Sequence, residues 1–177
     1  DFEDNTKKQY FGFRMLPGAF AQLTDKSASE AMDNFIDASE FFKLDSSFWN
    51  LEFDDAQTIF IDKLIDHFSN LKPSSFIELF LSISNNPHQS VEDIAQSMGY
   101  SAKQSHRLFI KHYGLSPKHI LSVIRLQKAL DILYRDPNTP LSHIALHVGY
   151  YDQSHFNNDL VQNLRLTPKQ LLNLFHD

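Results

Sequence analysis

The chain contains no cysteine, and this absence excludes disulfides, cysteine-ligated zinc and thiol catalysis. Glycine is scarce, with five residues in 177, and neither the Gly-x-Gly-x-x-Gly pattern nor the P-loop pattern of nucleotide-binding proteins is present. No apolar run approaches the roughly 18 residues that a membrane span needs, and no signal peptide is visible. We therefore expect a protein that does not enter the membrane.

Apolar residues are nonetheless plentiful. They make up 42% of the chain, and phenylalanine alone contributes 16 residues. This composition argues against wholesale disorder, and the length allows one domain or two small ones. Because the chain begins with Asp1 rather than methionine, we expect it to be a fragment that lacks an upstream part.

The net charge of −6 conceals a difference between the two halves of the chain. Residues 1–74 hold 7 Lys and Arg against 14 Asp and Glu, whereas residues 75–177 hold 9 against 8, together with eight of the nine histidines. Such an asymmetry is typical of a protein with one half that faces nucleic acid. The signal is weak, because residues 75–177 have a net charge of only +1, whereas a DNA-binding domain is expected to be strongly basic.

The beginning of the chain predicts one β-strand. Residues 10–16 are rich in aromatic side chains and are followed by a turn signal, Pro17-Gly18. An isolated strand is unstable, so its partner strands are expected before Asp1.

Two helices are predicted between this strand and the middle of the chain. Apolar residues recur at helical spacing over 28–42 and again over 55–71. Pro73 then ends the second helix, and we place a domain boundary there. The sequence thus predicts residues 1–72 as the remnant of one domain and residues 73–177 as a second domain.

The second domain contains an internal repeat. Four residues recur at an offset of 50: Ile94, Ala95, Gly99 and Tyr100 recur as Ile144, Ala145, Gly149 and Tyr150. Four more recur at an offset of 51, with Ser replaced by Thr: Leu115, Ser116, Pro117 and Lys118 recur as Leu166, Thr167, Pro168 and Lys169. The one-residue difference falls just after the glycine, where a turn can absorb it. We interpret the two segments as copies of one supersecondary unit.

Each copy has the pattern of a helix-turn-helix. A short helix over 91–98 ends at Gly99, which can adopt the positive φ of a sharp turn, and Ser101 can cap a second helix over 102–112. The second copy predicts the corresponding elements: helix 141–148, a turn at Gly149, the cap Asp152 and helix 153–163.

A long helix is predicted between the two copies. Ser116-Pro117 is a typical helix start, and apolar residues at helical spacing continue to about Tyr134. About 17 residues at 1.5 Å each give a rod of roughly 26 Å, which is comparable with the roughly 34 Å turn of a DNA duplex. The expected fold is mostly α: two helix-turn-helix units joined by a long linker helix, preceded by a small helical segment with a remnant β-strand.

The repeated motifs resemble those of AraC-type (AraC/XylS) bacterial transcription regulators. The resemblance covers about residues 74–177 and rests on two motifs, Ile94-Ala95-Gln96-Ser97-Met98-Gly99-Tyr100-Ser101 and Ile144-Ala145-x-x-Val148-Gly149-Tyr150-x-Asp152-Gln153-Ser154-x-Phe156. Residues 10–72 are similar, more weakly, to the end of the sensory domain of some of these regulators. The resemblance implies two helix-turn-helix units in successive major grooves and an N-terminal domain for effector sensing or dimerisation.

The first unit offers a row of cations for DNA. Lys103, Arg107 and Lys111 are spaced i, i+4, i+8 on the outward side of helix 102–112, and Gln104 and His106 flank them. Arg binds guanine, Gln binds adenine, and Lys binds guanine or phosphate. The resemblance places the family's base-contacting sites on Lys103, His106 and Arg107.

The second unit is poorer in charge. Its corresponding face carries only uncharged polar residues and one histidine: Gln153, Ser154, His155, Asn157 and Asn158. The family commonly has Arg or Lys at the position of Asn158, Gly at that of Arg165 and Leu at that of Ser105, and Asp159 is expected to add a negative charge toward phosphate. Few cations predict modest affinity and a shallow salt dependence, so we expect a homodimer on adjacent half-sites.

Two other classes of function remain open. The helix-turn-helix scaffold could serve as a protein–protein interaction module with weak or lost DNA binding, a reading that Asp159 favours. A metal-dependent enzyme is a weaker alternative: His143 and His147 are spaced i, i+4, but no glutamate completes the His-Glu-x-x-His pattern. We predict no enzyme activity, no cofactor and no metal.

The resemblance implies a cytoplasmic protein associated with the nucleoid. The partners expected from it are double-stranded DNA, a second copy of the chain, RNA polymerase and a small-molecule effector. The effector pocket would lie largely before Asp1.

Overall fold

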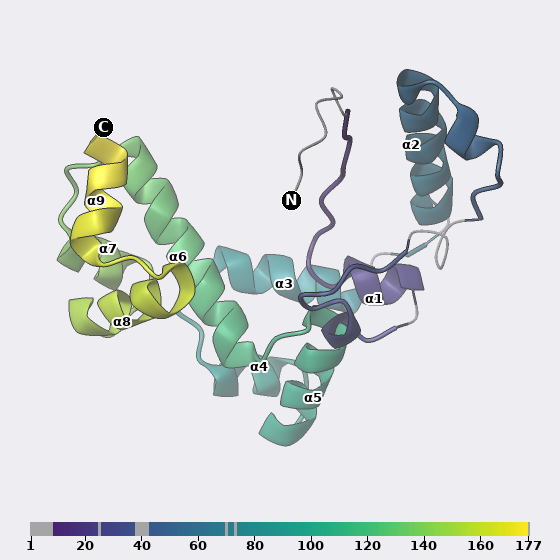
Figure 1. Ribbon diagram of the computed structural model, residues 1–177. Coiled ribbons are helices and arrows are strands. Elements are labelled where there is room, and N and C mark those ends of the chain that lie inside the picture. Colours follow the sequence, from purple (N-terminus) through teal and green to yellow (C-terminus); the bar gives the residue numbers. More distant parts are fainter. Residues whose placement is uncertain (1–8, 25, 38–42, 70, 73, 177) are drawn as a thin grey trace.

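The computed structural model describes residues 9–176 except residues 25, 38–42, 70 and 73. All regular secondary structure within these residues is helical (Figure 1). The elements, in chain order, are α1 (Ala19–Thr24), η1 (Ala28–Glu30), η3 (Phe48–Asn50), α2 (Phe53–Ser69), α3 (Ser75–Asn85), α4 (Val91–Ser97), α5 (Ala102–Tyr113), α6 (Pro117–Arg135), α7 (Leu141–His147), α8 (Gln153–Leu164) and α9 (Pro168–His176).

The mostly helical fold class predicted from the sequence is confirmed. Figure 1 shows α6 extending from the group formed by α3, α4 and α5 to the group formed by α7, α8 and α9, while α2 stands apart from both. Helices α1 and η1 lie against α5. None of the helices in the described part of the chain has the length and apolar character needed to cross a bilayer.

The first helix-turn-helix unit is built on its own hydrophobic core. Its buried residues come from α3, α4, α5 and the first half of α6: Ile83, Ile94, Phe109, Tyr113, Ile120, Leu121 and Ile124. The ring of Phe109 is fully buried and meets that of Tyr113 edge-on at a centroid distance of 4.9 Å. Each large apolar side chain buried in this way contributes about 1.5–3 kcal/mol to folding.

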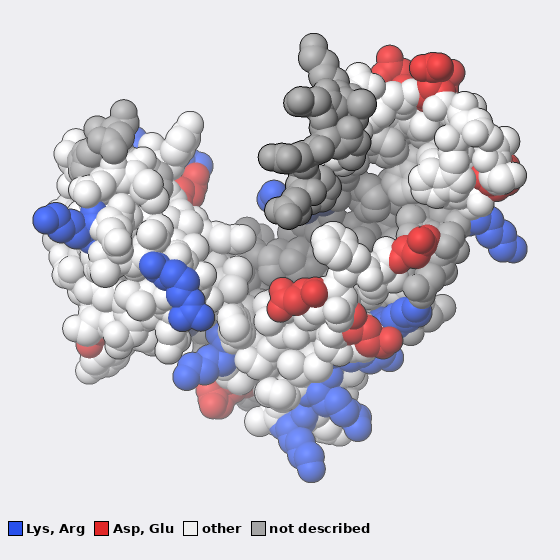
Figure 2. Space-filling view, in the orientation of Figure 1, with Lys and Arg blue, Asp and Glu red and all other residues white. Residues whose placement is uncertain are grey.

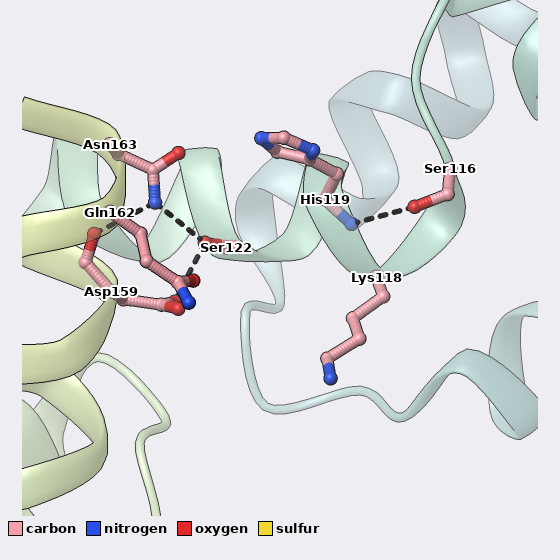
Figure 3. Close-up of a pocket in the computed structure, with 7 residues that line it drawn as sticks. All are labelled: Ser116, Lys118, His119, Ser122, Asp159, Gln162 and Asn163. Carbon is pink, nitrogen blue, oxygen red and sulfur yellow. Dashed lines mark hydrogen bonds between the residues drawn. The ribbon is translucent and has the colours of Figure 1, made fainter.

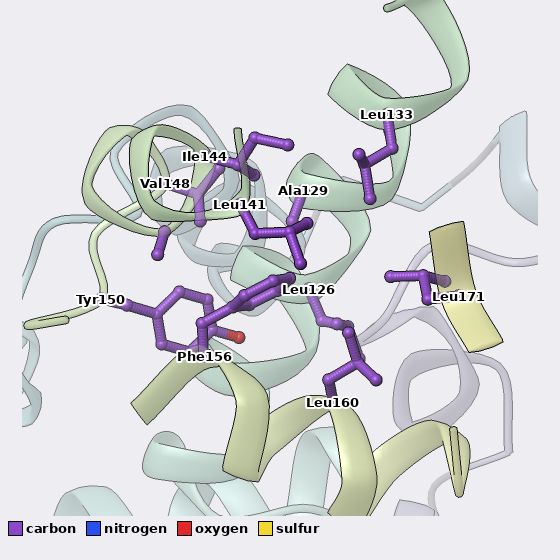
Figure 4. Packing of buried hydrophobic residues seen from close by; sticks show 11 residues of the cluster. Leu126, Ala129, Leu133, Leu141, Ile144, Val148, Tyr150, Phe156, Leu160 and Leu171 are labelled. Atoms are coloured by element: carbon purple, nitrogen blue, oxygen red, sulfur yellow. The ribbon is translucent and has the colours of Figure 1, made fainter. Parts of the chain in front are cut away.

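The second unit has a separate core, shown in Figure 4. Phe156 and Leu160 of α8 are fully buried in it, and Ile144 of α7 belongs to the same cluster. The second half of α6 supplies Leu126, Ala129 and Leu133. Helix α6 is therefore not a free spacer, because its two halves belong to the cores of the two units.

The predicted strand over residues 10–16 is wrong. The described residues 9–16 form no regular structure and pair with no strand in the described part of the chain. Their aromatic side chains pack on α2 instead: the rings of Phe11 and Phe13 each lie 5.7 Å from the ring of Phe60. The pattern of aromatic residues thus reflects packing on a helix rather than pairing in a sheet.

The helix predicted over 28–42 is also wrong as far as the structure describes it, and residues 38–42 lie outside the described residues. Only the single 3-10 turn η1 forms, closed by a capping box between Ser27 and Glu30. Asp33 then adopts a left-handed φ of 54°, which ends helical geometry for an L-residue. The helix predicted over 55–71 is confirmed as α2, whereas α1 and α9 were not predicted.

Candidate nucleic-acid interface

The two turns of the repeat have the same backbone geometry. The N–H of Tyr100 donates to the carbonyl of Ala95 at 3.0 Å, and the N–H of Tyr150 donates to the carbonyl of Ala145 at 2.9 Å. The glycine before each tyrosine has a positive φ, which glycine adopts with little strain. The repeat read from the sequence is therefore a repeat in three dimensions.

The helices that follow these turns, α5 and α8, are the candidate recognition helices. Ser101 caps α5 as predicted, and its hydroxyl accepts a hydrogen bond from the N–H of Gln104 at 3.3 Å. Asp152 caps α8 as predicted, and its carboxylate accepts from the N–H of His155 at 2.7 Å. These caps fix the direction in which the first turn of each helix presents its side chains.

The cationic stripe of α5, Lys103, Arg107 and Lys111, is exposed to solvent. None of the three forms an ion pair with another described residue, so their charges are available to a ligand. Figure 2 shows Lys and Arg side chains gathered over α5, whereas Asp and Glu side chains gather over α2. The opposite face of α5, with Ser105 and Phe109, is fully buried.

The two residues that flank the stripe are placed differently. His106 is exposed beside Arg107. Gln104 is also exposed, but its side-chain oxygen accepts from the backbone N–H of Ser101 at 3.0 Å and from the Ser101 hydroxyl at 2.9 Å. Only the amide nitrogen of Gln104 is thus left for a base, which limits it to contacts with base acceptors.

On α8 the predicted residues Gln153, Ser154, His155 and Asn158 are exposed, and Asn157 is half-buried. The side-chain oxygen of Asn157 is buried and has no hydrogen-bond partner. Asn157 is therefore oriented partly toward the protein interior, and the outward face of α8 is formed mainly by the other four residues.

Asp159 does not extend toward the outward face of α8. Its carboxylate accepts a hydrogen bond of 2.6 Å from the Ser122 hydroxyl of α6, and Asn163 donates to the same hydroxyl at 3.3 Å (Figure 3). These residues line a pocket of about 230 Å³ between α6 and α8. The expectation that Asp159 faces phosphate is accordingly wrong, because the carboxylate joins α8 to the linker helix.

Burial and the charge of Asp159 together affect the tyrosine of the second turn. Burial raises the pKa of the Tyr150 hydroxyl, and the neighbouring Asp159 carboxylate raises it further. Tyr150 therefore stays neutral and belongs to the core of the second unit rather than to the candidate DNA-binding surface.

The segment before the first unit contacts α5 at the end that lies away from its cap. The Ser27 hydroxyl donates to the backbone carbonyl of Lys111 at 3.4 Å, and Met32 lies beside Gly114. The first two turns of α5, with Lys103 and Arg107, remain uncovered. The front of the chain thus supports α5 without blocking its candidate DNA-binding face.

Two residues on or near this surface escaped the sequence interpretation. Tyr151, next to the Asp152 cap, is 87% exposed. It is the extra residue that changes the repeat offset from 50 to 51, and this insertion is the sequence feature that could have identified it. Arg125 of α6 donates two hydrogen bonds to backbone carbonyls, and no sequence pattern indicates these contacts.

The histidine pair considered as a metal site gains no further ligands. No group of three or more His, Asp or Glu side chains in the described part of the chain is arranged to hold a metal ion. The backbone carbonyl of His147 instead lies 3.1 Å from Nε2 of His88.

Comparison with known protein families matches residues 94–173 to a helix-turn-helix domain. Among curated proteins, the lactose operon transcription activator of Staphylococcus xylosus is 30% identical over 91 residues, which are 51% of this chain and 32% of that protein. The transcriptional activator RhaS of Escherichia fergusonii is 32% identical over 82 residues, or 46% of this chain and 29% of that protein. The chain thus corresponds to about a third of the length of these relatives.

Two solved structures have a similar fold. The C-terminal domain of AraT, a response regulator from Geobacillus stearothermophilus, matches 55% of this chain and 82% of that chain with a TM-score of 0.50 and 24% identity. A DNA-binding transcriptional dual regulator from Escherichia coli K-12 matches 60% of this chain and 96% of that chain with a TM-score of 0.50 and 19% identity. At these identities the similarity establishes the fold of the paired helix-turn-helix units.

Proposed function

We propose that the protein is a sequence-specific DNA-binding transcription regulator of bacteria, of the AraC type. The match of residues 94–173 to a helix-turn-helix domain and the similarity to two transcription activators support this proposal. Helices α5 and α8 would enter two successive major grooves of one duplex. The observation that carries this proposal is the repeated geometry: two capped helices with exposed polar faces, each preceded by the same glycine turn.

The length and anchoring of α6 support binding to two grooves. Its 19 residues give a rod of about 28 Å at 1.5 Å per residue, and successive major grooves on one side of a duplex are separated by roughly 34 Å. The two halves of α6 are packed into different cores, so each unit is attached to one end of the same helix.

The two recognition helices would contribute differently. On α5, Arg107 is suited to a bidentate contact with guanine, while Lys103 and Lys111 neutralise phosphates. On α8, Gln153 and Asn158 are suited to adenine. We infer that α5 supplies most of the electrostatic attraction and that α8 adds base selectivity.

The remaining partners follow from the family and the relatives. The names of the relatives describe transcription activators, so we propose that this protein also regulates transcription, in the cytoplasm and in contact with RNA polymerase. A homodimer on adjacent half-sites would compensate for the scarcity of cations on α8. We retain residues 1–72 and 73–177 as the domain division, and a small-molecule effector as a further partner.

Selection of bound duplexes from a random pool tests the proposal. We expect enrichment of sites with two conserved elements about one helical turn apart. Enrichment of a single short element would limit base recognition to α5. A gel shift with random duplex at low salt separates the alternative, because a protein–protein interaction module would show no binding even under conditions that favour non-specific contacts.

A further inference from the structure

We infer that Arg125 is a positioning residue that fixes the orientation of the two helix-turn-helix units relative to each other. Its guanidinium lies half-buried on α6, between the loop that precedes α4 and the turn that precedes α8. Nε donates to the carbonyl of Pro87 at 2.9 Å, and Nη2 donates to the carbonyl of Gln89 at 3.3 Å. The same guanidinium carbon is 6.0 Å from the centre of the Tyr150 ring.

Two further contacts join the loop and the turn directly. Nε2 of His88 lies 3.1 Å from the carbonyl oxygen of His147. A Cβ atom added to Gly149 would lie 3.0 Å from the carbonyl oxygen of Pro87 and 3.3 Å from Nε of Arg125. We call this set (Pro87, His88, Arg125, His147 and Gly149) the inter-unit contact; the first two residues belong to the first unit and the last two to the second.

The repeat itself shows that the close approach is specific to the second turn. Gly99 occupies the matching position in the first unit and also has a positive φ, but a Cβ atom added there would meet no atom within 4 Å. The backbone conformation explains glycine at both positions. Only at Gly149 does close packing against another unit add a second reason.

The position of the inter-unit contact explains why it would matter for binding. Two bodies that share only one helix can still bend or twist about that helix, whereas a second contact beside the helix removes this freedom. A planar guanidinium can donate to two carbonyl oxygens in a fixed geometry, which a lysine ammonium does not reproduce. The inference rests on the proposed function in one respect: the fixed orientation would make binding depend on the spacing of the two half-sites.

The first experiment measures the orientation without DNA. Because the chain has no cysteine, spin labels attached to Gln96→Cys in α4 and Gln162→Cys in α8 report one inter-unit distance by pulsed electron paramagnetic resonance. Both side chains are exposed and lie outside the predicted DNA contacts. We expect a single narrow distribution for the otherwise unchanged chain and one at least about twice as wide for Arg125→Ala, because the two units could then bend and twist about α6.

Matched variants identify the cause of any change. Arg135→Ala removes the same residue type from the other end of α6, where it forms only an exposed pair with Asp131, and should leave the distribution narrow. Gly149→Ala should widen the distribution and Gly99→Ala should not, although both place a side chain at positive φ. Arg125→Lys should give an intermediate width. Equal widths for Arg125→Ala and Arg135→Ala would overturn the inference.

The second experiment uses DNA and separates the two proposals. Inserting two base pairs between the half-sites rotates one of them by about 70°, at about 10.5 base pairs per turn. We expect the insertion to weaken binding of the unchanged chain at least tenfold, roughly the effect of a mismatched base pair, and to weaken binding of Arg125→Ala much less. If the unchanged chain binds no DNA while Arg125→Ala still has the wider distance distribution, the inter-unit contact is retained and the proposed function is rejected.

Folding of every variant is checked by circular dichroism. If Arg125→Ala does not fold, His88→Ala replaces it, because this change removes one exposed hydrogen bond of the same contact. An unchanged distance distribution in a folded His88→Ala variant, together with an unchanged one in Gly149→Ala, would overturn the inference.

Discussion

Substituting Arg107 by alanine is the most direct test of the candidate DNA interface. The side chain is exposed and forms no ion pair with a described residue, so its removal should change the free energy of unfolding by less than about 0.5 kcal/mol. A bidentate contact with guanine contributes about 1–3 kcal/mol, which corresponds to a loss of affinity of about 5- to 150-fold at 1.4 kcal/mol per factor of ten. The loss should be concentrated on the selected sequence.

The repeat supplies the reverse substitution. Asn158 of α8 corresponds to Arg107 of α5, because each residue lies six positions after the cap of its helix. Asn158 is exposed as well. Asn158→Arg should therefore raise the affinity about 3- to 10-fold at low salt and steepen the slope of log K against log salt by about 0.9, as expected for one additional phosphate contact.

Fluorescence anisotropy with a selected duplex and a scrambled duplex, between about 50 and 200 mM salt, measures all of these quantities. Arg135→Ala is the control, because Arg135 is exposed at the far end of α6 and pairs only with Asp131. Equal affinity of Arg107→Ala and the unchanged chain for both duplexes would refute the assignment of α5 as a recognition helix. A parallel loss for both duplexes, with a shallower salt slope, would move Arg107 from base to phosphate contact.

Four further predictions concern stability. Arg165 has a left-handed φ of 58° at the end of α8, where α5 has Gly114. Arg165→Gly should stabilise the fold by about 0.5–1 kcal/mol, because the strain that it removes exceeds the entropy that glycine adds to the unfolded chain. Gly114→Ala should destabilise the fold, because the new Cβ would lie 2.8 Å from Met32 Cγ. Thermal unfolding checks both signs. Ser105→Ala should change the unfolding free energy by less than about 1 kcal/mol, or stabilise the fold, in urea titrations, because the buried hydroxyl bonds only a thioether sulfur at 3.8 Å. Burial, and to a lesser extent the charge of Lys111, lowers the pKa of His112 below its ordinary 6.5. The unfolded chain therefore binds more protons than the folded one, and stability is lost as the pH falls below about 6.5. His112→Gln should reduce this loss, as measured by urea titrations at about pH 7 and pH 5.

Sequence repetition predicted the second domain well because each repeated residue type has a local structural role. Ser101 and Asp152 can cap a helix from their own side chains, and Gly99 and Gly149 permit the turn without help from distant residues. Such local requirements are visible in the sequence itself, and the helix boundaries were correspondingly close to those observed.

The front of the chain was predicted poorly because its structure depends on distant contacts. The aromatic residues of 10–16 have the composition of a strand, yet Phe11 and Phe13 are held by the ring of Phe60 on α2. The apolar spacing over 28–42 suggests a helix, yet Asp33 adopts a left-handed conformation. Periodicity indicates which residues are apolar on one side, but it does not indicate which neighbour covers them.

The same distinction applies to the site. Exposure of the cationic stripe followed from helical spacing alone, whereas the roles of Asp159 and Arg125 depend on partners about 37 residues away in the chain. Both residues connect α6 to the units at its ends, Asp159 through Ser122 and Arg125 through the loop before α4. On an outward face the Asp159 carboxylate would repel phosphate, but in its observed position it binds Ser122 and connects α8 to α6. Since α8 has few charges of its own, its contribution to the proposed DNA binding would depend on being held at a fixed distance and angle from α5. On this argument the contacts of α6 would influence specificity in addition to the base-facing side chains.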